Sequence, residues 1–529
     1  MRRLTTLRVL AAGLLAAGLA GWPAFADEPK RGGILNLAIS AETATYDGIA
    51  SDTFATMHFA APFYSELLKF DLASYPKLKG DLAESWSVAS DLKSYTFKLK
   101  PNVTFHDGSP LTSADVKASY DRMRKPSPGV VSVRQATFED IGTIETPDPL
   151  TVVFRMADVN PGMLEHFASP WNFIYSAAKL AQDPKFPEQN ILGSGPFRFV
   201  EHVRGSHVQG VRNDKYFQAG KPYLDGFRGV FMLQPAAMLN AMQGGQVLGE
   251  FRGISPAERD RLKQAMGDKI RTEESSWTLN LLVSFNTQKK PFDDVRVRRA
   301  LSMAIDRWGG SQGLARTSTL NGVGGLMRPG STYATPEAEL VKLPGFSKDI
   351  GASRAEAKKL LAEAGVPNLS FKLLNRSIAQ PYTPAGVFLV DQWRQIGVTV
   401  ENLQQETSPY FAALSSGNYD VAVDFSNLFM DEPTLGLSKY VSFDRAPENR
   451  SRVIDRDIDS LFDKQRHSVD TKVRGDLIRQ MEKRTLEQSY SVPLLWWHRI
   501  VATNAKLMGW QMSASHLLGQ DLADVWLAE

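Results

Sequence analysis

The sequence predicts an α/β protein, and three observations lead to that class. Residues 353–425 alternate helix and strand patterns with short links, which is typical of a parallel, doubly wound sheet. Residues 92–124 place a strand pattern before a helix pattern. The 529 residues are 43% hydrophobic and 22% charged, close to the average for globular proteins. This composition excludes a disordered chain, a fibrous repeat and a multi-span membrane protein, and the length predicts at least two cores.

The first 26 residues have the pattern of a secretory signal peptide. Three arginines precede the apolar run 9–20, and small residues stand at the two positions expected before a cleavage site. An N-terminal membrane anchor is the alternative, but this run is shorter than the roughly 20 residues that a transmembrane helix needs. We therefore expect export to the periplasm, with cleavage near Ala26 and Asp27.

Charge and cysteine content narrow the class of protein further. Without the three leader arginines, the chain has 58 basic against 58 acidic residues, so no nucleic-acid partner is expected. The chain contains no cysteine, which excludes disulfides and attachment of a lipid to a cysteine. Both facts fit a free periplasmic protein, and we expect a monomer.

The segment 92–124 predicts one strand and one helix. Residues 94–100 alternate apolar and polar side chains, the period of a half-buried strand. A turn at 106–108 follows. Thr112 is the predicted N-cap of a helix with Asp115 in its first turn. Its apolar stripe consists of Val116, Tyr120 and Met123.

A second helix is predicted within residues 291–307. Asp293 or Asp294 caps it, and the apolar residues between 297 and 305 face inward. Three arginines, at 296, 298 and 299, are expected on the solvent side, with an anion site as the alternative.

The segment 353–425 predicts the sheet. A capping box begins a helix at Ser353, and Ser408 is the predicted N-cap of a later one. Strands are predicted at 369–374, 398–403 and 419–425, with a helix at 384–396. Ligands of such sheets bind beyond the carboxyl ends of the strands. These ends point to residues 375–376, 404–407 and 427–433.

Motifs for catalysis are weak. The chain has no phosphate-binding loop motif and no H-E-x-x-H motif. Ser311 lies in a G-x-S-x-G match, but a helix pattern ends near Arg307, so the match is expected in a loop after a helix. A nucleophile elbow requires a strand before the serine. The eight histidines are scattered, so neither a metal site nor a cofactor is predicted. We expect binding without turnover, and a secreted serine hydrolase using Ser311 is the remote alternative.

Three blocks of sequence carry a resemblance to a known family. The first comprises residues 81–86, 95–97, 103–108 and 111–116, and the second comprises 193–197 and 213–216. The third comprises 285–287, 291–298 and 304–307. In their order and spacing these blocks resemble family 5 of the extracellular solute-binding proteins, the peptide/nickel-type receptors of ATP-driven (ABC) importers.

The resemblance implies two lobes with mixed sheets joined by a hinge, and an extra subdomain in lobe one. Lobe one would span residues 27–285 and include the subdomain at about 66–190. Lobe two would span residues 286–490. The C-terminal residues 491–529 would return to lobe one. Such proteins close over a ligand and deliver it to an inner-membrane ABC permease. The implied ligand is a peptide-like or other small polar organic solute. A nickel or metal-complex receptor of the same family is the alternative.

The resemblance also implies ligand contacts in lobe two. Family members often carry an acidic residue after a lobe-two strand that meets the amino terminus of a peptide. The corresponding stretch here includes Asn427 and Asp431. In the dipeptide-binding branch, an arginine stands just before a Pro-Tyr pair. The corresponding pair here is Pro381-Tyr382, and the residue before it is Gln380. A glutamine cannot grip a carboxylate as a guanidinium does, so Arg376 either supplies that charge or is a surface residue.

Lobe one and the returning segment supply the remaining predicted contacts. Three residues lie near the first-lobe cleft positions of the family: Thr53, Phe54 and Trp277. Trp496 and Trp497 are adjacent in a strand pattern, so their side chains point to opposite faces. At most one of them faces the core, and the other offers a ligand an apolar platform. His498 is the candidate ligand for the metal alternative.

Overall fold

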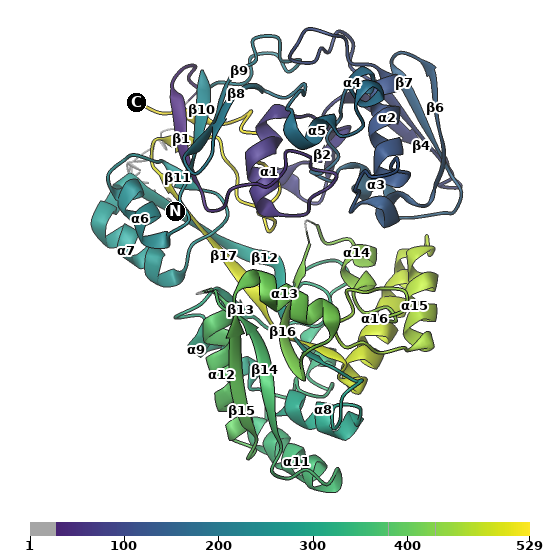
Figure 1. Ribbon diagram of the computed structural model, residues 1–529, viewed down its shortest axis with the longest axis vertical. Helices are drawn as coiled ribbons and strands as arrows, with labels where there is room; N and C mark the ends of the chain where they lie inside the picture. The colour runs from purple at the N-terminus through teal and green to yellow at the C-terminus, as the bar shows by residue number, and fades with distance from the viewer. Residues whose placement is uncertain (1–27, 379, 429) are drawn as a thin grey trace, which may run out of the picture.

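The computed structural model describes residues 28–378, 380–428 and 430–529, and the predicted leader lies outside them. Two lobes lie one above the other (Figure 1). Two long antiparallel strands, β12 (Ile270–Phe285) and β17 (Ser491–Asn504), pass between the lobes. The predicted two-lobed α/β fold is therefore confirmed.

A single mixed sheet extends through both lobes in the order β15-β14-β16-β12-β17-β11-β1-β10-β9-β8. At the lobe-two end, β14 (Ser370–Arg376) is parallel to β15 (Thr399–Gln405) and to β16 (Val421–Asn427). The helices α12 (Tyr382–Arg394) and α13 (Thr407–Ser416) connect these strands. The parallel sheet predicted from residues 353–425 is confirmed.

The lobe-one end of the sheet combines parallel and antiparallel pairing. Its first strand, β1 (Ile34–Ile39), is parallel to β10 (Gly226–Phe231) and to β11 (Gly249–Glu250). The antiparallel strands β9 (His207–Arg212) and β8 (Phe197–Val203) complete it.

A separate four-stranded antiparallel sheet forms a subdomain of lobe one (Figure 1). Its order is β4 (Ala83–Val88), β5 (Ser94–Leu99), β7 (Thr151–Met156) and β6 (Ile141–Asp148). The helix α2 (Ser113–Arg124) packs against this sheet. The strand at 94–100 and the helix after Thr112 are thus confirmed, and the Asp115 carboxylate accepts a hydrogen bond from the Thr112 backbone N–H at 2.8 Å.

The remaining elements cover the sheets or connect them. The helices are α1 Phe54–Ala60, α3 Met163–Phe167, α4 Ala177–Gln182, α5 Phe186–Gln189, α6 Pro235–Gln243, α7 Pro256–Met266, α8 Val295–Met303, α9 Arg307–Leu314, α10 Glu337–Leu340, α11 Ile350–Glu363, α14 Pro433–Ser438, α15 Arg456–Arg466 and α16 Thr471–Gln488. The short strands are β2 Leu68–Phe70, β3 Leu78–Gly80, β13 Leu320–Gly322, β18 Leu507–Met508 and β19 Trp526–Leu527. Short 3₁₀ helices lie at Ala61–Phe63, Leu72–Ser74, Gln135–Phe138 and Gly267–Lys269.

Each lobe has a hydrophobic core, and the two long strands contribute to both lobes. Residues of β12 from Trp277 to Phe285 pack in the core of lobe two. Ile270, at the other end of the same strand, packs with Ile500 of β17 beneath α6 and α7. The lobes also touch across the groove, because Met430 of lobe two is buried in the core of lobe one.

Two helix starts differ from the sequence prediction. The helix α11 begins at Ile350, because the Asp349 carboxylate accepts from the backbone N–H of Ala352 at 2.9 Å. Ser353 therefore lies inside the first turn, and its hydroxyl donates to the Asp349 carbonyl. The N-cap of α13 is Glu406, not Ser408.

The arginines of α8 also differ from the prediction. Asp294 is the N-cap, as expected, but its carboxylate pairs with Arg296. Arg298 is buried, and its guanidinium donates to the carbonyls of Phe292 and Gln488. The prediction that Arg298 faces solvent is wrong because neighbouring segments fold over its long side chain and supply acceptors.

Candidate ligand-binding site

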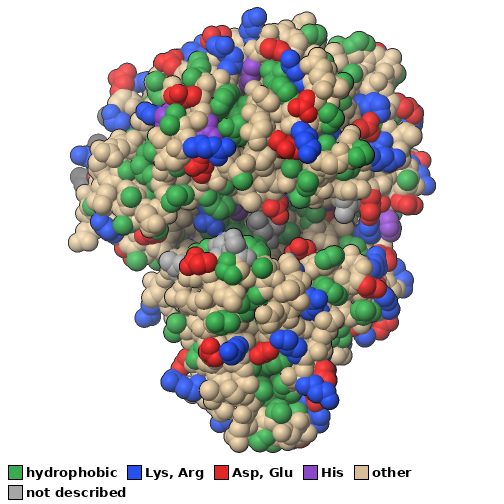
Figure 2. Space-filling view, viewed as in Figure 1, with side chains coloured by type: hydrophobic (Ala, Val, Ile, Leu, Met, Phe, Trp, Pro, Cys, Tyr) green, Lys and Arg blue, Asp and Glu red, His purple; other side chains and the backbone are tan. Residues whose placement is uncertain are grey.

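The surface is hollowed between the two lobes (Figure 2). Aromatic and guanidinium side chains from both lobes and from the long strands contact one another where the lobes adjoin. We call this group the arginine–aromatic cluster; it comprises Phe54, Arg252, Trp277, Arg376, Tyr382 and Trp497. Five of these six residues were predicted from the sequence, and the structure brings them together.

Arg252 is the member that sequence analysis missed. Its guanidinium carbon lies 4.3 Å from the ring centre of Phe54 and 6.0 Å from that of Trp277. Cations are attracted to aromatic faces at such distances. The residue follows the two-residue strand β11, which has no recognisable periodicity, so no local signal marked it.

A tight turn orients Arg252. The Glu250 carboxylate accepts hydrogen bonds from the backbone N–H groups of Arg252 (3.1 Å) and Gly253 (2.7 Å). Gly253 has a φ of +154°, and a β-carbon at that position would lie 3.2 Å from the Trp277 ring. Glycine is therefore required for both the turn and the ring contact. Within the described residues, Nε of Arg252 has no hydrogen-bond partner.

Lobe two and the long strands provide the other wall. The rings of Trp277 and Trp497 meet edge to face at 5.3 Å, and Tyr382 lies 6.4 Å from Trp497. Arg376, the last residue of β14, stands over the rings of Tyr382 (5.6 Å) and Phe411 (5.3 Å). The indole Nε1 of Trp497 is buried and has no acceptor among the described residues.

The cluster owes its positive charge to its arginines, because the two histidines that contact it, His58 and His516, are neutral. Burial lowers the pKa of His58 to about 3 and that of His516 well below its usual value. Their hydrogen bonds are internal: Nε2 of His58 contacts the His516 carbonyl at 2.8 Å, and the indole of Trp277 donates to Nδ1 of His516 at 3.0 Å. Burial raises the pKa of Tyr382 to about 12, although the charge of Arg376 opposes this rise.

Asp431 lies beside the cluster, but it is already paired. Nε and Nη2 of Arg328 donate to its two carboxylate oxygens at 2.8 and 2.5 Å. Its backbone N–H donates to the hydroxyl of Tyr75 in lobe one at 3.1 Å. Arg328 also donates to Ser276, the residue before Trp277 on β12, at 2.7 Å. We call Asp431 and Arg328 together the Asp431–Arg328 pair.

The remaining predicted contacts lie outside the cluster or at its edge. Thr53 is the exposed N-cap of α1, next to Phe54 in the chain. Asn427 is the last residue of β16, and its side chain is not described. His498 pairs with Glu274, with 2.7 Å between Nε2 and Oε2.

The prediction that at most one of the two adjacent tryptophans faces a core is wrong. Trp496 and Trp497 are 2% and 6% exposed. Their side chains do point to opposite faces, but both faces of β17 are covered here. The indole of Trp496 donates to the Gly325 carbonyl at 3.2 Å, while Trp497 is covered by Trp277.

The structure around the candidate residues supports neither a serine hydrolase nor a metal receptor. Ser311 lies inside α9, and its hydroxyl donates to the Trp308 carbonyl at 2.9 Å. The prediction that this motif lies in a loop is wrong, and a helix interior is also not the turn of a nucleophile elbow. Within the described ranges, no group of three or more His, Asp or Glu residues is placed to hold a metal ion.

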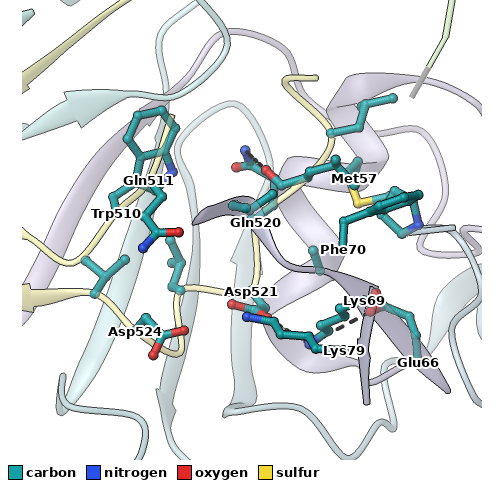
Figure 3. A pocket seen from close by; sticks show the side chains of 18 of the residues that line it. Met57, Glu66, Lys69, Phe70, Lys79, Trp510, Gln511, Gln520, Asp521 and Asp524 are labelled. Carbon is teal, nitrogen blue, oxygen red and sulfur yellow. Dashed lines mark hydrogen bonds and ion pairs between the residues drawn. The ribbon is translucent and has the colours of Figure 1, made fainter. Parts of the chain in front are cut away.

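A second cavity, of about 90 Å³, lies inside lobe one, where the C-terminal segment packs against β2 (Figure 3). Lys69 is buried there between Asp521 (2.7 Å), Asp81 (3.1 Å) and Glu66 (3.8 Å). Its ammonium group is fully paired by these carboxylates. The ion pair between Lys69 and Asp521 attaches the C-terminal segment to lobe one.

Ionic contacts join the lobes away from the cluster. Arg466 of α15 donates to Glu139 at 3.0 Å and to Asp140 at 2.8 Å, both in lobe one. Glu432 accepts from Arg474 within lobe two and lies 3.7 Å from His166 of lobe one. Burial lowers the pKa of His166, so its contact with Glu432 is not ionic. We call the contacts of Arg466 with Glu139 and Asp140 the ionic clasps; they join the two lobes.

A groove between two hinged lobes, lined by aromatic rings and guanidinium groups, defines a receptor that encloses a small solute. The chain belongs to the bacterial extracellular solute-binding proteins, family 5, whose family model matches residues 77–444. This family consists of solute-binding proteins. Within the described part of the chain, no helix combines the length and the apolar character that crossing a membrane demands.

Several relatives of known name are similar to this chain. A glutathione-binding protein of Pectobacterium atrosepticum is 30% identical over 373 residues, covering 69% of this chain and 68% of the relative. Di/tripeptide-binding protein 1 of Pseudomonas aeruginosa is 25% identical and covers 82% of this chain and 83% of the relative.

Solved structures share the fold over nearly the whole chain. The binding protein AgaA of A. tumefaciens R10, in complex with agropinic acid, has a TM-score of 0.79 and 26% identity, covering 94% of this chain and 99% of AgaA. The periplasmic binding protein DppA of Helicobacter pylori, in complex with a peptide, has a TM-score of 0.81 and 22% identity, with the same coverage.

Proposed function

We propose that this protein is the periplasmic receptor of an ABC importer for a small, peptide-like solute that carries a carboxylate. After export and cleavage near Ala26, the monomeric receptor closes over the solute and delivers it unchanged to an inner-membrane permease. The receptor binds and releases its ligand without catalysing a reaction.

One observation carries this proposal: two buried N–H donors of the cluster have no acceptor among the described residues. They are Nε of Arg252 and Nε1 of Trp497. Buried donors in native proteins are almost always paired, so such a group calls for an acceptor. A carboxylate is the acceptor that matches the planar fork of a guanidinium.

The relatives support a carboxylate-bearing ligand. Two of them are named for glutathione and for di- and tripeptides, and AgaA was solved in complex with agropinic acid. All of these compounds are acids. A shared preference for acids is what a cluster built around guanidinium groups would produce.

We assign each member of the cluster a part in binding. Arg252 from lobe one and Arg376 from lobe two grip carboxylate oxygens from opposite sides when the lobes close. Trp277, Tyr382 and Trp497 give the carbon skeleton of the ligand an apolar surface.

The test is to purify the protein from its host and to weigh it by native mass spectrometry, before and after mild denaturation. A bound mass of a few hundred daltons that carries a carboxylate supports the proposal. Thermal shifts are then measured with glutathione, di- to tetrapeptides, nickel and nickel chelates. A shift with nickel alone, or silence toward every acid, would contradict the proposal.

A further inference from the structure

The Asp431–Arg328 pair has a consequence for ligand selection. Both carboxylate oxygens of Asp431 accept hydrogen bonds from Arg328, in the two-point geometry that makes such pairs strong. The side chains are 15% and 12% exposed, so both are mostly shielded from water. A ligand ammonium group that approached Asp431 would have to displace a guanidinium that is better placed.

Displacement would also leave Arg328 without its carboxylate. Removing one partner of a largely buried ion pair is costly because the other charge stays desolvated. Arg328 also donates a hydrogen bond to Ser276 on β12. The Asp431 backbone N–H donates one to the hydroxyl of Tyr75 in lobe one. The pair is therefore held by the same closure that encloses the ligand.

We propose that Arg328 removes Asp431 as an anchor for amino groups, so that this receptor selects solutes by their carboxylate and not by a free amino terminus. The inference rests on the proposed function, since it concerns the same groove. The predicted ligands are carboxylates whose α-amino group is acylated or absent. Ordinary peptides also bind, but their ammonium group adds nothing to the affinity.

Matched pairs of probes test the selection. Glutathione, Ala-Glu and Ala-Ala-Ala are each titrated calorimetrically into the mature protein, in free and N-acetylated form. In every pair that binds, we expect the acetylated form to bind within threefold of the free amine or more tightly. A preference of more than threefold for the free amine overturns this inference and leaves the proposed function intact. If none of the six probes binds, the proposed function falls, and the inference falls with it.

Variants then test the role of Arg328. In Arg328→Gln, Asp431 is free to meet an ammonium group, so the affinity ratio should shift at least fivefold toward the free amine. Adding Asp431→Asn should reverse that shift, because the released carboxylate is gone. Arg466→Gln is the matched control: it removes an arginine that joins the lobes elsewhere, and it should leave the ratio unchanged. An unchanged ratio in Arg328→Gln overturns the assignment.

Discussion

Charged side chains meet at the boundary between the lobes in two different ways. In the ionic clasps, Arg466 of lobe two faces the carboxylates of Glu139 and Asp140 of lobe one within hydrogen-bond distance. In the arginine–aromatic cluster, Arg252 stands over the face of an aromatic ring, and its Nε is unpartnered among the described residues.

This difference suggests separate roles for the two sets of arginines, one in closing the lobes and one in recognising the ligand. A guanidinium paired with a carboxylate of its own protein has little left to offer a ligand. A guanidinium held by an aromatic face keeps its donors for a partner from outside, because the ring attracts the charge without accepting its hydrogen bonds. We infer that the clasps favour the closed state, whereas the cluster sets which solute is enclosed.

Arg252→Met should have the largest effect. The variant keeps an apolar side chain over Phe54 but loses the charged donors. Hydrogen bonds to charged groups contribute about 1.5–3 kcal/mol, so affinity for a carboxylate probe should fall roughly 10- to 100-fold. Calorimetry with the tightest acid found in the screen provides the measurement. Arg394→Gln, on the surface of α12, should bind as the wild type does. Equal affinity in Arg252→Met would remove Arg252 from the site.

His58→Gln tests whether His58, which contacts Phe54 of the cluster, stays neutral. The folded pKa of His58 is about 3, below its unfolded value of 6.5, so only the unfolded chain takes up this proton as the pH falls. This contribution to stability is present above pH 6.5 and is lost as the pH falls below that value. Glutamine can still donate to the His516 carbonyl and does not titrate.

The measurement for His58 is the free energy of unfolding in urea at pH 7.5 and at pH 5. Between these values the wild type should lose about 2 kcal/mol more than His58→Gln does. Parallel losses in the two proteins would mean that His58 is charged when folded, and the cluster would then have a pH-dependent charge of its own.

Arg466→Gln should have the smallest effect. It removes the charge of the ionic clasps, but glutamine keeps an amide donor, and the buried carboxylate of Asp140 keeps its hydrogen bond from Asn160 at 2.9 Å. The cost should therefore be that of about one hydrogen bond, about 1 kcal/mol, and affinity should fall less than about tenfold for every ligand alike. Small-angle X-ray scattering of the unliganded protein should show a larger radius of gyration as the open fraction grows. A change in the order of preference among ligands would contradict the division between clasps and cluster.

The sequence predicted the fold where periodicity was strong. The parallel strands of lobe two and the helix after Thr112 follow from apolar spacing and capping residues, and the structure contains them. Helix starts were less certain because several polar residues compete for one cap: Asp349 took the role predicted for Ser353. Burial of Arg298 depends on chain segments far away in sequence, which spacing cannot reveal.

Part of the candidate site was also predictable. Arg376 and Tyr382 follow from the rule that ligands bind beyond the carboxyl ends of parallel strands, together with the family resemblance. Arg252 was not predictable, since it follows a strand of two residues whose place depends on β1 and β17. The pairing of Asp431 was missed because Arg328 lies 103 positions away in the chain.

The two long strands have a consequence for how this protein folds. The second half of β12 belongs to the core of lobe two, and β17 reaches that core only after the chain has completed α16. Neither lobe is therefore complete until the last forty or so residues have been synthesised. During synthesis and export, both lobes therefore stay incomplete until β17 pairs with β12.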